Sequence, residues 1–237
     1  MAEPMAYALI TGASSGIGRH LALELAARGL DVVLVARNDS PLQELRLEIE
    51  TRHQVRATVI AIDLSVPGAA ANLYTELRTS MPPPDVLVNN AGFGSFGLFH
   101  EADGEVLQRL VQVNILALTC LLRRALPEMR ARGSGRVLNV ASCAAFNAGP
   151  LMAVYFATKA YVLHLSEAVA QECVGSGGDG DSAVSWRHRH RVSSHRGLPR
   201  GLVVIRTASC GTAGGSGALW HPGAVCGSPH RHPRRGQ

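Results

Sequence analysis

The chain has 237 residues, of which 46% are hydrophobic, and this is enough to bury one substantial core within a single domain of the larger kind. No apolar run reaches the roughly 18 residues that would suggest a membrane span, and the N-terminus has no basic segment before an apolar one. We therefore expect a cytoplasmic protein that binds no membrane. Five cysteines lie at wide spacings without a CxxC pair, which argues against a disulfide framework and against a zinc site.

The net charge of +5 is divided unevenly along the chain. Residues 1–185 contain 14 lysines and arginines and all 18 acidic residues, whereas residues 186–237 contain nine arginines and no acid. The basic character therefore belongs to the C-terminal segment alone. Only one of the 23 basic residues is a lysine, Lys159, so a specific reason is expected for that choice.

Short apolar runs alternate with amphipathic stretches over the first 175 residues. Runs rich in valine, isoleucine and leucine are typical of strands buried on both faces of a parallel sheet. The expected strands are residues 6–11, 31–36, 55–62, 85–89 and 136–141. The expected helices lie near residues 17–28, 40–53, 66–80, 103–131 and 153–174. This alternation predicts an α/β fold, a Rossmann-like doubly wound parallel sheet covered on both sides.

The first expected strand runs into TGASSGIG at residues 11–18 and then into a helix. Gly12, Gly16 and Gly18 would permit a sharp turn, the approach of a phosphate to the backbone and close packing of the helix on the sheet. The helix N-terminus would offer unpaired N–H groups to a pyrophosphate. The turn indicates a dinucleotide site, although a tight turn without a ligand could have the same composition.

The next two loops bear on the choice of cofactor. The second expected strand ends in VARND, which places Arg37 where an acidic residue would accept hydrogen bonds from a ribose 2′-hydroxyl. A guanidinium suits a 2′-phosphate, so NADP(H) is favoured over NAD(H). The alternative is a solvated arginine, with Asp39 serving the ribose. Asp63 is placed to hydrogen-bond the adenine, but an aspartate that caps the next helix would look the same.

The catalytic candidates lie in VYFATKA, at residues 154–160. In a helix Tyr155 and Lys159 share one face, so the ammonium can lie near the phenol and favour the phenolate. Arginine is bulkier and planar and would not replace this compact cation, which gives a reason for the single lysine. Ser142 ends the fifth expected strand, at the carboxyl edge of the sheet where ligands bind in such folds. Taken alone, Ser142 would be interpreted as a cap of a helix or loop.

Five ordered motifs together resemble the short-chain dehydrogenase/reductase family, over residues 5–176. They are TGASSGIG (11–18), NNAG (89–92), Asn114 in VNILA, Ser142, and the pair Tyr155 and Lys159 in YFATK. The resemblance implies an oxidoreductase that transfers a hydride between nicotinamide and a carbonyl or alcohol substrate. Because Arg37 stands at the end of the second expected strand, the expected cofactor is NADP(H). The resemblance further implies a homo-oligomer and a small-molecule carbonyl or alcohol substrate. No nucleic-acid partner is expected.

The resemblance also implies a role for each site residue. Tyr155 would be the general acid or base, and Ser142 would orient and polarise the carbonyl or hydroxyl. Lys159 would hold the nicotinamide ribose and favour ionisation of the tyrosine, and Asn114 would support a water in the proton relay. The expected cofactor-binding residues are Gly12, Ser14, Ser15, Gly16, Ile17, Gly18, Arg37, Asp63, Leu64, Asn90, Ala91, Gly92, Tyr155 and Lys159.

The resemblance ends near Gly177, where a family member would continue with a sixth strand, a Pro-Gly turn and a threonine. This chain continues GDGDSAVSWRHRHRV at residues 178–192. The genetic code permits the same bases, read one position later, to encode VTVTALSPGGTGTEF, which has those features. We therefore predict a frameshift, which divides the chain into an NADP-binding domain at residues 1–177 and an out-of-frame, disordered basic tail at 178–237.

This interpretation of the tail has three consequences. The sheet would lack its last strands, GLVVIR at residues 201–206 would resemble a strand only by chance, and activity would be impaired. RHRHR could suggest a nucleic-acid patch or a metal cluster, but it lacks aromatic interleaving and ordered ligand spacing. Because residues 11–92 are intact, the alternative function is a dinucleotide-binding protein without turnover.

Overall fold

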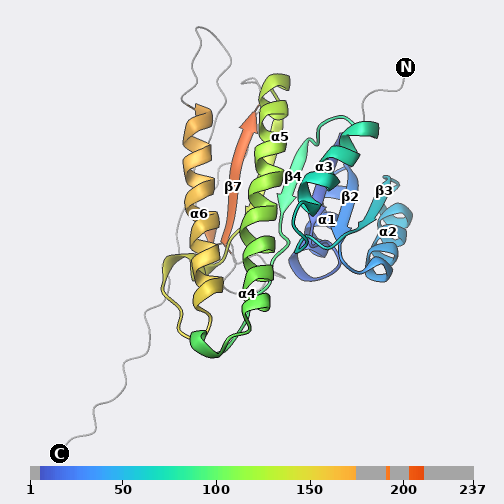
Figure 1. Ribbon diagram of the computed structural model, residues 1–237. Coiled ribbons are helices and arrows are strands. Elements are labelled where there is room, and N and C mark those ends of the chain that lie inside the picture. Colours follow the sequence, from blue (N-terminus) through green and yellow to red (C-terminus); the bar gives the residue numbers. More distant parts are fainter. Residues whose placement is uncertain (1–5, 175–190, 193–202, 211–237) are drawn as a thin grey trace, which may run out of the picture.

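A computed structural model describes residues 6–174, 191–192 and 203–210 of the chain (Figure 1). Its sheet has the strand order β3-β2-β1-β4-β5-β7-β6. The strands are β1 (Tyr7–Thr11), β2 (Asp31–Ala36), β3 (Ala57–Ala61), β4 (Val86–Asn89), β5 (Gly135–Val140), β6 (Arg191–Val192) and β7 (Val203–Cys210). Strands β1 to β5 pair in parallel, which confirms the five expected strands and the parallel sheet.

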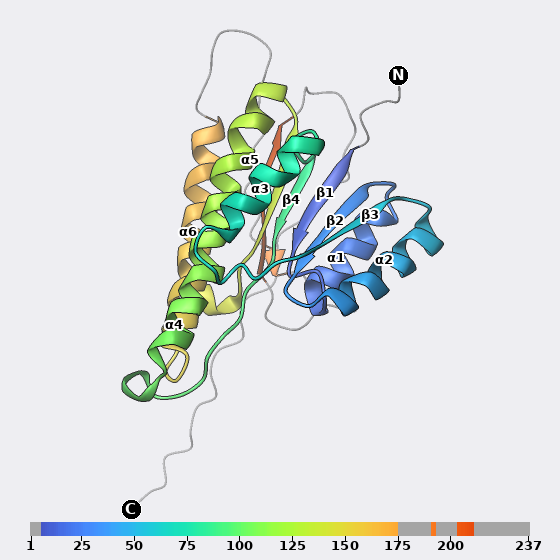
Figure 2. The same cartoon turned by 45° about the vertical axis from the view of Figure 1, so that its right-hand side comes forward.

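Helices cover both faces of this sheet. They are α1 (Gly16–Ala26), α2 (Asp39–His53), α3 (Ala69–Ser80), α4 (Gly104–Val111), α5 (Leu118–Arg132) and α6 (Ala153–Val174), with short 3-10 turns η1 (Phe99–Glu101) and η3 (Cys143–Phe146). In Figures 1 and 2, α1 and α2 lie on one face, and α3, α5 and α6 lie on the other. The doubly wound α/β fold is therefore confirmed.

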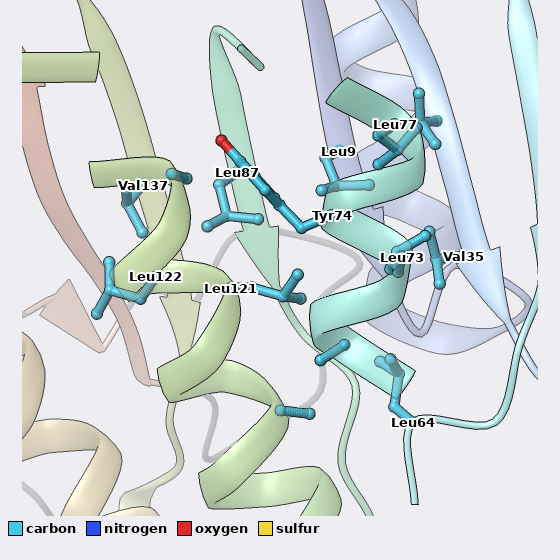
Figure 3. Packing of buried hydrophobic residues seen from close by; sticks show 14 of the residues in the cluster. Leu9, Val35, Leu64, Leu73, Tyr74, Leu77, Leu87, Leu121, Leu122 and Val137 are labelled. Carbon is cyan, nitrogen blue, oxygen red and sulfur yellow. The ribbon is translucent and has the colours of Figure 1, made fainter. Parts of the chain in front are cut away.

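The strands bury alternate side chains in two separate cores. In β1, Leu9 belongs to the core beneath α3 and α5, whereas Ile10 belongs to the core beneath α1 and α2. Figure 3 shows Leu9 and Leu87 facing the leucines of α3 and α5. Successive strand residues point to opposite faces, and here both faces are covered. This is why the strand sequences are continuously apolar rather than alternating.

The expected helix at residues 103–131 is divided in the structure. A π-helical segment, η2 (Gln112–Ala117), joins α4 to α5. Such segments are rare and often lie at functional sites, and this one contains Asn114. Hydrophobic periodicity did not predict it, since one widened turn leaves the apolar face on either side almost unchanged.

Among the described residues, one helical stretch, Gly104–Arg132, is long and apolar enough to cross a membrane by length and composition alone. The sequence-based expectation that no stretch would suggest a span is therefore corrected. The stretch packs against β4, β5, α3 and α6. It buries Leu110, Leu118, Leu121, Leu122, Ala125 and Met129. Of this apolar window, 39% is buried in the structure.

Beyond β5, the sheet continues with a strand from the C-terminal segment. Strand β7 pairs antiparallel with β5, from Gly135↔Cys210 to Val140↔Val204, and β6 pairs antiparallel with β7. The expectation that residues 178–237 contribute no strand is therefore wrong for these two segments. An open edge at β5 would leave a row of backbone N–H and C=O groups unpaired, and β7 begins with three β-branched residues that favour extended backbone.

Strand β7 runs antiparallel to β5, so it is not the sixth parallel strand that a family member would have and that we expected to be missing. In the part of the chain that the structure describes, no sixth parallel strand follows β5. The disorder expected for the rest of the tail concerns positions outside the described residues. The frameshift and the division of the chain at residue 177 stay predictions.

Candidate functional site

A cavity of about 720 Å³ opens at the carboxyl ends of the parallel strands. The strand order reverses between β1 and β4, and ligands bind at this point in open α/β sheets. Fourteen of the residues expected at the site line the cavity: Gly12, Ser14, Ser15, Gly16, Ile17, Arg37, Asp63, Leu64, Asn90, Ala91, Gly92, Ser142, Tyr155 and Lys159. The expected residues Gly18 and Asn114 do not line it but lie in contact with residues that do. The structure thus brings together side chains from five strand ends and α6.

The glycine-rich turn after β1 packs directly on the loop after β4. Gly12 has φ +66°, and a Cβ there would lie 2.8 Å from Asn90 Nδ2 and 2.9 Å from Ala91 Cα. A Cβ on Gly18 would collide with the Gly12 carbonyl. Both glycines are therefore required for close packing, as expected from the sequence. The turn leads into the start of α1, where unpaired N–H groups can receive a phosphate.

Thr11 connects the same two loops, and the sequence analysis did not assign it a role. Its buried hydroxyl accepts hydrogen bonds from the N–H groups of Asn90 and Ala91, each at 3.0 Å, and donates one to the Val88 carbonyl at 3.2 Å. Asn90 Nδ2 in turn donates to the carbonyls of Thr11 and Gly12. The first letter of TGASSGIG was the available signal, but only the fold shows that its partners lie about 80 residues away.

Thr11→Val is expected to destabilise the protein by about 2–3 kcal/mol, because the isosteric side chain leaves buried N–H and C=O groups without partners. Urea unfolding followed by circular dichroism measures the change. Thr79→Val is the matched control, since the exposed Thr79 hydroxyl donates a local hydrogen bond to the Glu76 carbonyl within α3, and we expect a change within about 0.5 kcal/mol. Equal stability losses in the two variants would contradict this role of Thr11.

Arg37 and Asp63 lie at the end of the cavity where an adenosine phosphate is expected. Arg37 is exposed and lines the cavity. Asp39, the alternative partner for a ribose, does not line it, and its carboxylate accepts a hydrogen bond from Gln43 one turn along α2. The geometry therefore favours Arg37 over Asp39 as the residue that meets a ligand.

The Asp63 carboxylate accepts a hydrogen bond from the Ser65 N–H at 2.9 Å within the loop after β3. The alternative that Asp63 caps the next helix is wrong, because α3 begins at Ala69 and Gly68 is its N-cap. Burial alone would raise the pKa of Asp63, but the Ser65 hydrogen bonds and the positive charges of Arg37 and Arg109 together bring it below its usual range. Asp63 is therefore ionised at neutral pH. Arg109, on α4, adds a second cation near this end of the cavity, and no motif in the sequence pointed to it. A contact of Asp63 with adenine stays a prediction.

Lys159 is a buried cation beneath the cavity. Its side chain is 6% exposed, and Nζ donates a hydrogen bond to the Val140 carbonyl at 2.9 Å. Nζ also lies 5.8 Å from the centre of the Tyr155 ring, which confirms that the two residues share one face of α6. Burial lowers the pKa of Lys159 from 10.5 to about 8. The site therefore stabilises the charged form of Lys159 poorly. Shifted pKa values of this kind are common at functional sites.

Ser142 follows β5 and has two roles in the structure. Its Oγ accepts a hydrogen bond from the Ala144 N–H at 3.2 Å and so caps η3, as the structural alternative predicted. The same residue lines the cavity with Tyr155. A hydroxyl that accepts from an amide can still donate its own proton. In the structure the Ser142 hydroxyl donates its proton to Cys143 Sγ at 4.0 Å. Sulfur is a weak acceptor, so this proton can be donated to a ligand instead.

Asn114, in the π-helical segment η2, connects the loop after β4 to α6. Its Oδ1 accepts from the Phe93 N–H at 3.1 Å, and its Nδ2 donates to the Phe93 carbonyl and to Thr158 Oγ1. Thr158 donates in turn to the Tyr155 carbonyl. Asn114 therefore ties the loop after β4 to α6, the helix that carries Tyr155 and Lys159. Support of a relay water by Asn114 stays a prediction.

A buried chain of hydrogen bonds also fixes α6 on the sheet. Asn89 of β4 donates to Asn139 of β5 at 2.9 Å, Asn139 donates to Ser166 of α6 at 2.9 Å, and Ser166 donates to the Val162 carbonyl. Ser166 and Asn139 are fully buried. Within the described residues, Asn89 Oδ1 is the one oxygen of this network that is left without a partner. Buried polar networks help to specify one arrangement of a core. This network sets the register of the helix that carries Tyr155 and Lys159.

In a comparison with known protein families, residues 6–177 match the family described as short chain dehydrogenase. The very-long-chain 3-oxoacyl-CoA reductase of Rattus norvegicus is 32% identical over 177 residues, which are 72% of this chain and 55% of the relative. The inactive hydroxysteroid dehydrogenase-like protein 1 of Pongo abelii is 31% identical over 175 residues, covering 72% and 52%. The chain therefore spans about half the length of these curated relatives.

Among solved structures, a short-chain dehydrogenase from Sphingobium yanoikuyae in complex with NADPH superposes with a TM-score of 0.67. It is 36% identical, and the match covers 71% of this chain and 65% of that one. The family match over residues 6–177 contains every residue that lines the cavity.

Proposed function

Because the chain belongs to the short-chain dehydrogenase family, we propose that it is an NADP(H)-dependent oxidoreductase that transfers a hydride between nicotinamide and a carbonyl or alcohol substrate. The observation that carries this proposal is that Ser142, Tyr155 and Lys159 line one cavity together with the glycine turn and Arg37. A similar solved structure contains NADPH. The cavity thus joins a place for a dinucleotide to a set of groups able to move a proton.

The residues present fit NADP(H). The segment from Gly12 to Gly18 would bind the pyrophosphate, because it lines the cavity and leads into the N-terminus of α1, where unpaired N–H groups can receive a phosphate. Arg37 would meet the 2′-phosphate, and Asp63, Leu64 and Asn90–Gly92 would surround the adenosine. Tyr155 and Lys159 would contact the nicotinamide ribose. When bound, the cofactor would supply the hydride for reduction of a carbonyl, or accept it in the reverse direction.

The protein's own groups would act on the substrate oxygen. Ser142 would donate a hydrogen bond to that oxygen and stabilise the negative charge that develops on it. Tyr155 would then transfer its phenolic proton to the same oxygen as a general acid. Lys159, 5.8 Å from the ring centre, would stabilise the resulting phenolate. Its hydrogen bond to the Val140 carbonyl keeps the cation on the tyrosine side of α6.

Arg37→Asp is expected to weaken NADPH binding by about 10- to 100-fold, the equivalent of one hydrogen bond to a charged group. NADH should bind more tightly in the same variant, since a carboxylate repels a 2′-phosphate and accepts from a 2′-hydroxyl. Calorimetric titration with each cofactor measures both effects. Arg28→Asp is the control, because it makes the same charge change on exposed Arg28, beyond the opposite end of α1. If the ratio of NADPH to NADH affinity were the same in Arg37→Asp as in the parent, Arg37 would not bind the 2′-phosphate.

A second candidate is a dinucleotide-binding protein without turnover. The observation that favours it is the end of the family match at residue 177, together with an antiparallel β7 as the next neighbour of β5. A relative of similar coverage is described as inactive. Titration with NADPH, followed by an assay against a panel of carbonyl compounds, separates the two functions. Binding without turnover, combined with turnover by a version whose reading frame is restored at residue 177, would favour the second for this chain.

A further inference from the structure

The end of the cavity near Tyr155 differs chemically from the end near Arg37. It is lined by Phe93, Gly94 and Met152, next to Ser142. Two loops supply these residues: the loop after β4, at residues 90–99, and the segment after β5, at residues 141–158. Neither contains a charged residue. The two loops therefore offer no charged side chain to a ligand near Tyr155.

The two loops lie against each other beside the reacting groups. The Gly97 N–H donates a hydrogen bond to the Leu151 carbonyl at 2.8 Å. A Cβ on Gly94 would lie 2.9 Å from Met152 Cε and 3.3 Å from Tyr155 Cδ2. The backbone at Gly94 is thus in contact with the catalytic ring, and the loop then runs outward to its contact with Leu151.

Large apolar side chains are exposed along this outward path. Phe96 is 76% exposed, Phe99 is 67%, Leu98 is 47% and Leu151 is 40%. A single exposed apolar residue is ordinary, but several on two loops that are hydrogen-bonded to each other beside a cavity indicate a binding surface. We name Phe96, Leu98, Phe99 and Leu151 the apolar mouth.

We propose that the substrate is an uncharged carbonyl compound with a bulky apolar substituent, and that the apolar mouth binds this substituent. The inference rests on the proposed function, because Ser142 and Tyr155 fix the position of the carbonyl oxygen. A small ketone would leave the mouth in water, whereas a longer one can cover it without leaving the cavity. A carboxylate or phosphate on the substituent would find no cation in either loop. Lys159 follows the second loop, but it is buried against the Val140 carbonyl beside Tyr155, so a charge at the mouth would be desolvated without a partner.

A surface for another protein copy is the main competing use of the mouth. The continuity of the mouth with the cavity favours the substrate, since Gly94 and Met152 line the cavity while Gly97 and Leu151, a few residues outward, join the two loops. Phe96 lies between Gly94 and Gly97 in the chain. A substituent that leaves the carbonyl group would therefore pass along this path.

The test uses the full chain saturated with NADP⁺, which binds a ketone without reducing it. Dissociation constants of 2-alkanones of increasing length are measured by calorimetry. We expect affinity to rise by about fourfold for each methylene that the mouth covers, and a 2-alkanone with a terminal carboxylate to bind at least about tenfold more weakly. Phe96→Ser and Leu98→Ser should each flatten the dependence on length. Leu47→Ser is the matched control, because Leu47 is 58% exposed on α2, away from the cavity.

NADP⁺ binding is measured first, so that the two proposals fail separately. If NADP⁺ does not bind, the proposed function and this inference both fail. If NADP⁺ binds but ketone affinity is independent of length, or the carboxylate compounds bind more tightly, only the substrate class is overturned. Self-association that Phe96→Ser abolishes, without any dependence on ketone length, would also overturn it and would make the mouth an interface between copies.

Discussion

Tyr155→Phe is expected to reduce turnover by about 10²- to 10⁴-fold, which is the usual contribution of general acid or base catalysis. The variant keeps the aromatic ring that contacts Gly94 and loses only the hydroxyl that would give its proton to the substrate oxygen. NADPH affinity should therefore remain nearly unchanged. Single-turnover rates with a saturating ketone, together with calorimetric titration by NADPH, separate the chemical step from cofactor binding.

Tyr161→Phe is the matched control for this experiment. Tyr161 lies on the same helix, and its hydroxyl pairs with Thr119 at 3.0 Å. It does not line the cavity, so the turnover of this variant should match that of the parent. If Tyr155→Phe kept more than about a hundredth of the parent rate, Tyr155 would not be the proton donor.

Lys159→Met is expected to abolish turnover and yet to stabilise the cofactor-free protein at neutral pH. Burial lowers the pKa of Lys159 from 10.5 to about 8, which corresponds to a cost of about 3 kcal/mol for keeping the charged form in the fold. Methionine removes that cost but also loses the hydrogen bond to the Val140 carbonyl, worth about 1 kcal/mol. We therefore expect a net gain of about 1–2 kcal/mol in the free energy of unfolding.

The pH dependence of this gain identifies its cause. Below about pH 8 the lysine is protonated in both the folded and the unfolded chain, so the parent bears the whole cost of burial. Between about pH 8 and 10.5 the unfolded parent binds more protons than the folded one, and the stability of the parent therefore rises with pH. The advantage of Lys159→Met should shrink across this window. A difference that stays constant with pH would show that packing, not the charge, causes it.

Lys159→Arg distinguishes charge from shape. The guanidinium keeps the positive charge, but it is larger and planar and cannot occupy the place of a compact ammonium beside Val140. We expect this variant to lose turnover and also to lose stability. NADPH should stabilise the parent against heat more than either variant, because only the parent retains the group expected at the nicotinamide ribose.

The sequence predicted the part of the molecule in which local pattern and local chemistry agree. The apolar runs predicted β1 to β5 because both faces of this sheet are buried. Tyr155 and Lys159 were found because an i, i+4 pair in a helix necessarily shares a face. The glycine turn was found because the backbone at Gly12 requires a positive φ that other residues rarely adopt.

The rest depends on contacts between distant segments, which a single sequence does not encode locally. Thr11 meets Asn90, Asn114 meets Thr158, and Asn139 meets Ser166 only after the sheet has formed. The role of β7 was mispredicted for the same reason. Residues 201–206 had the composition of a strand, but the sequence did not show that the edge of β5 would be free to pair with it in the antiparallel direction.

The most direct test of the proposed activity is a single-turnover reaction of the full 237-residue chain. The protein is held in excess over NADPH, a bulky apolar ketone is added, and NADPH absorbance and alcohol formation are followed together. We predict that one equivalent of NADPH disappears for each alcohol formed, and that Tyr155→Phe abolishes both signals. NADPH that binds the parent but is never consumed, with any ketone in the panel, would contradict an oxidoreductase function for this chain.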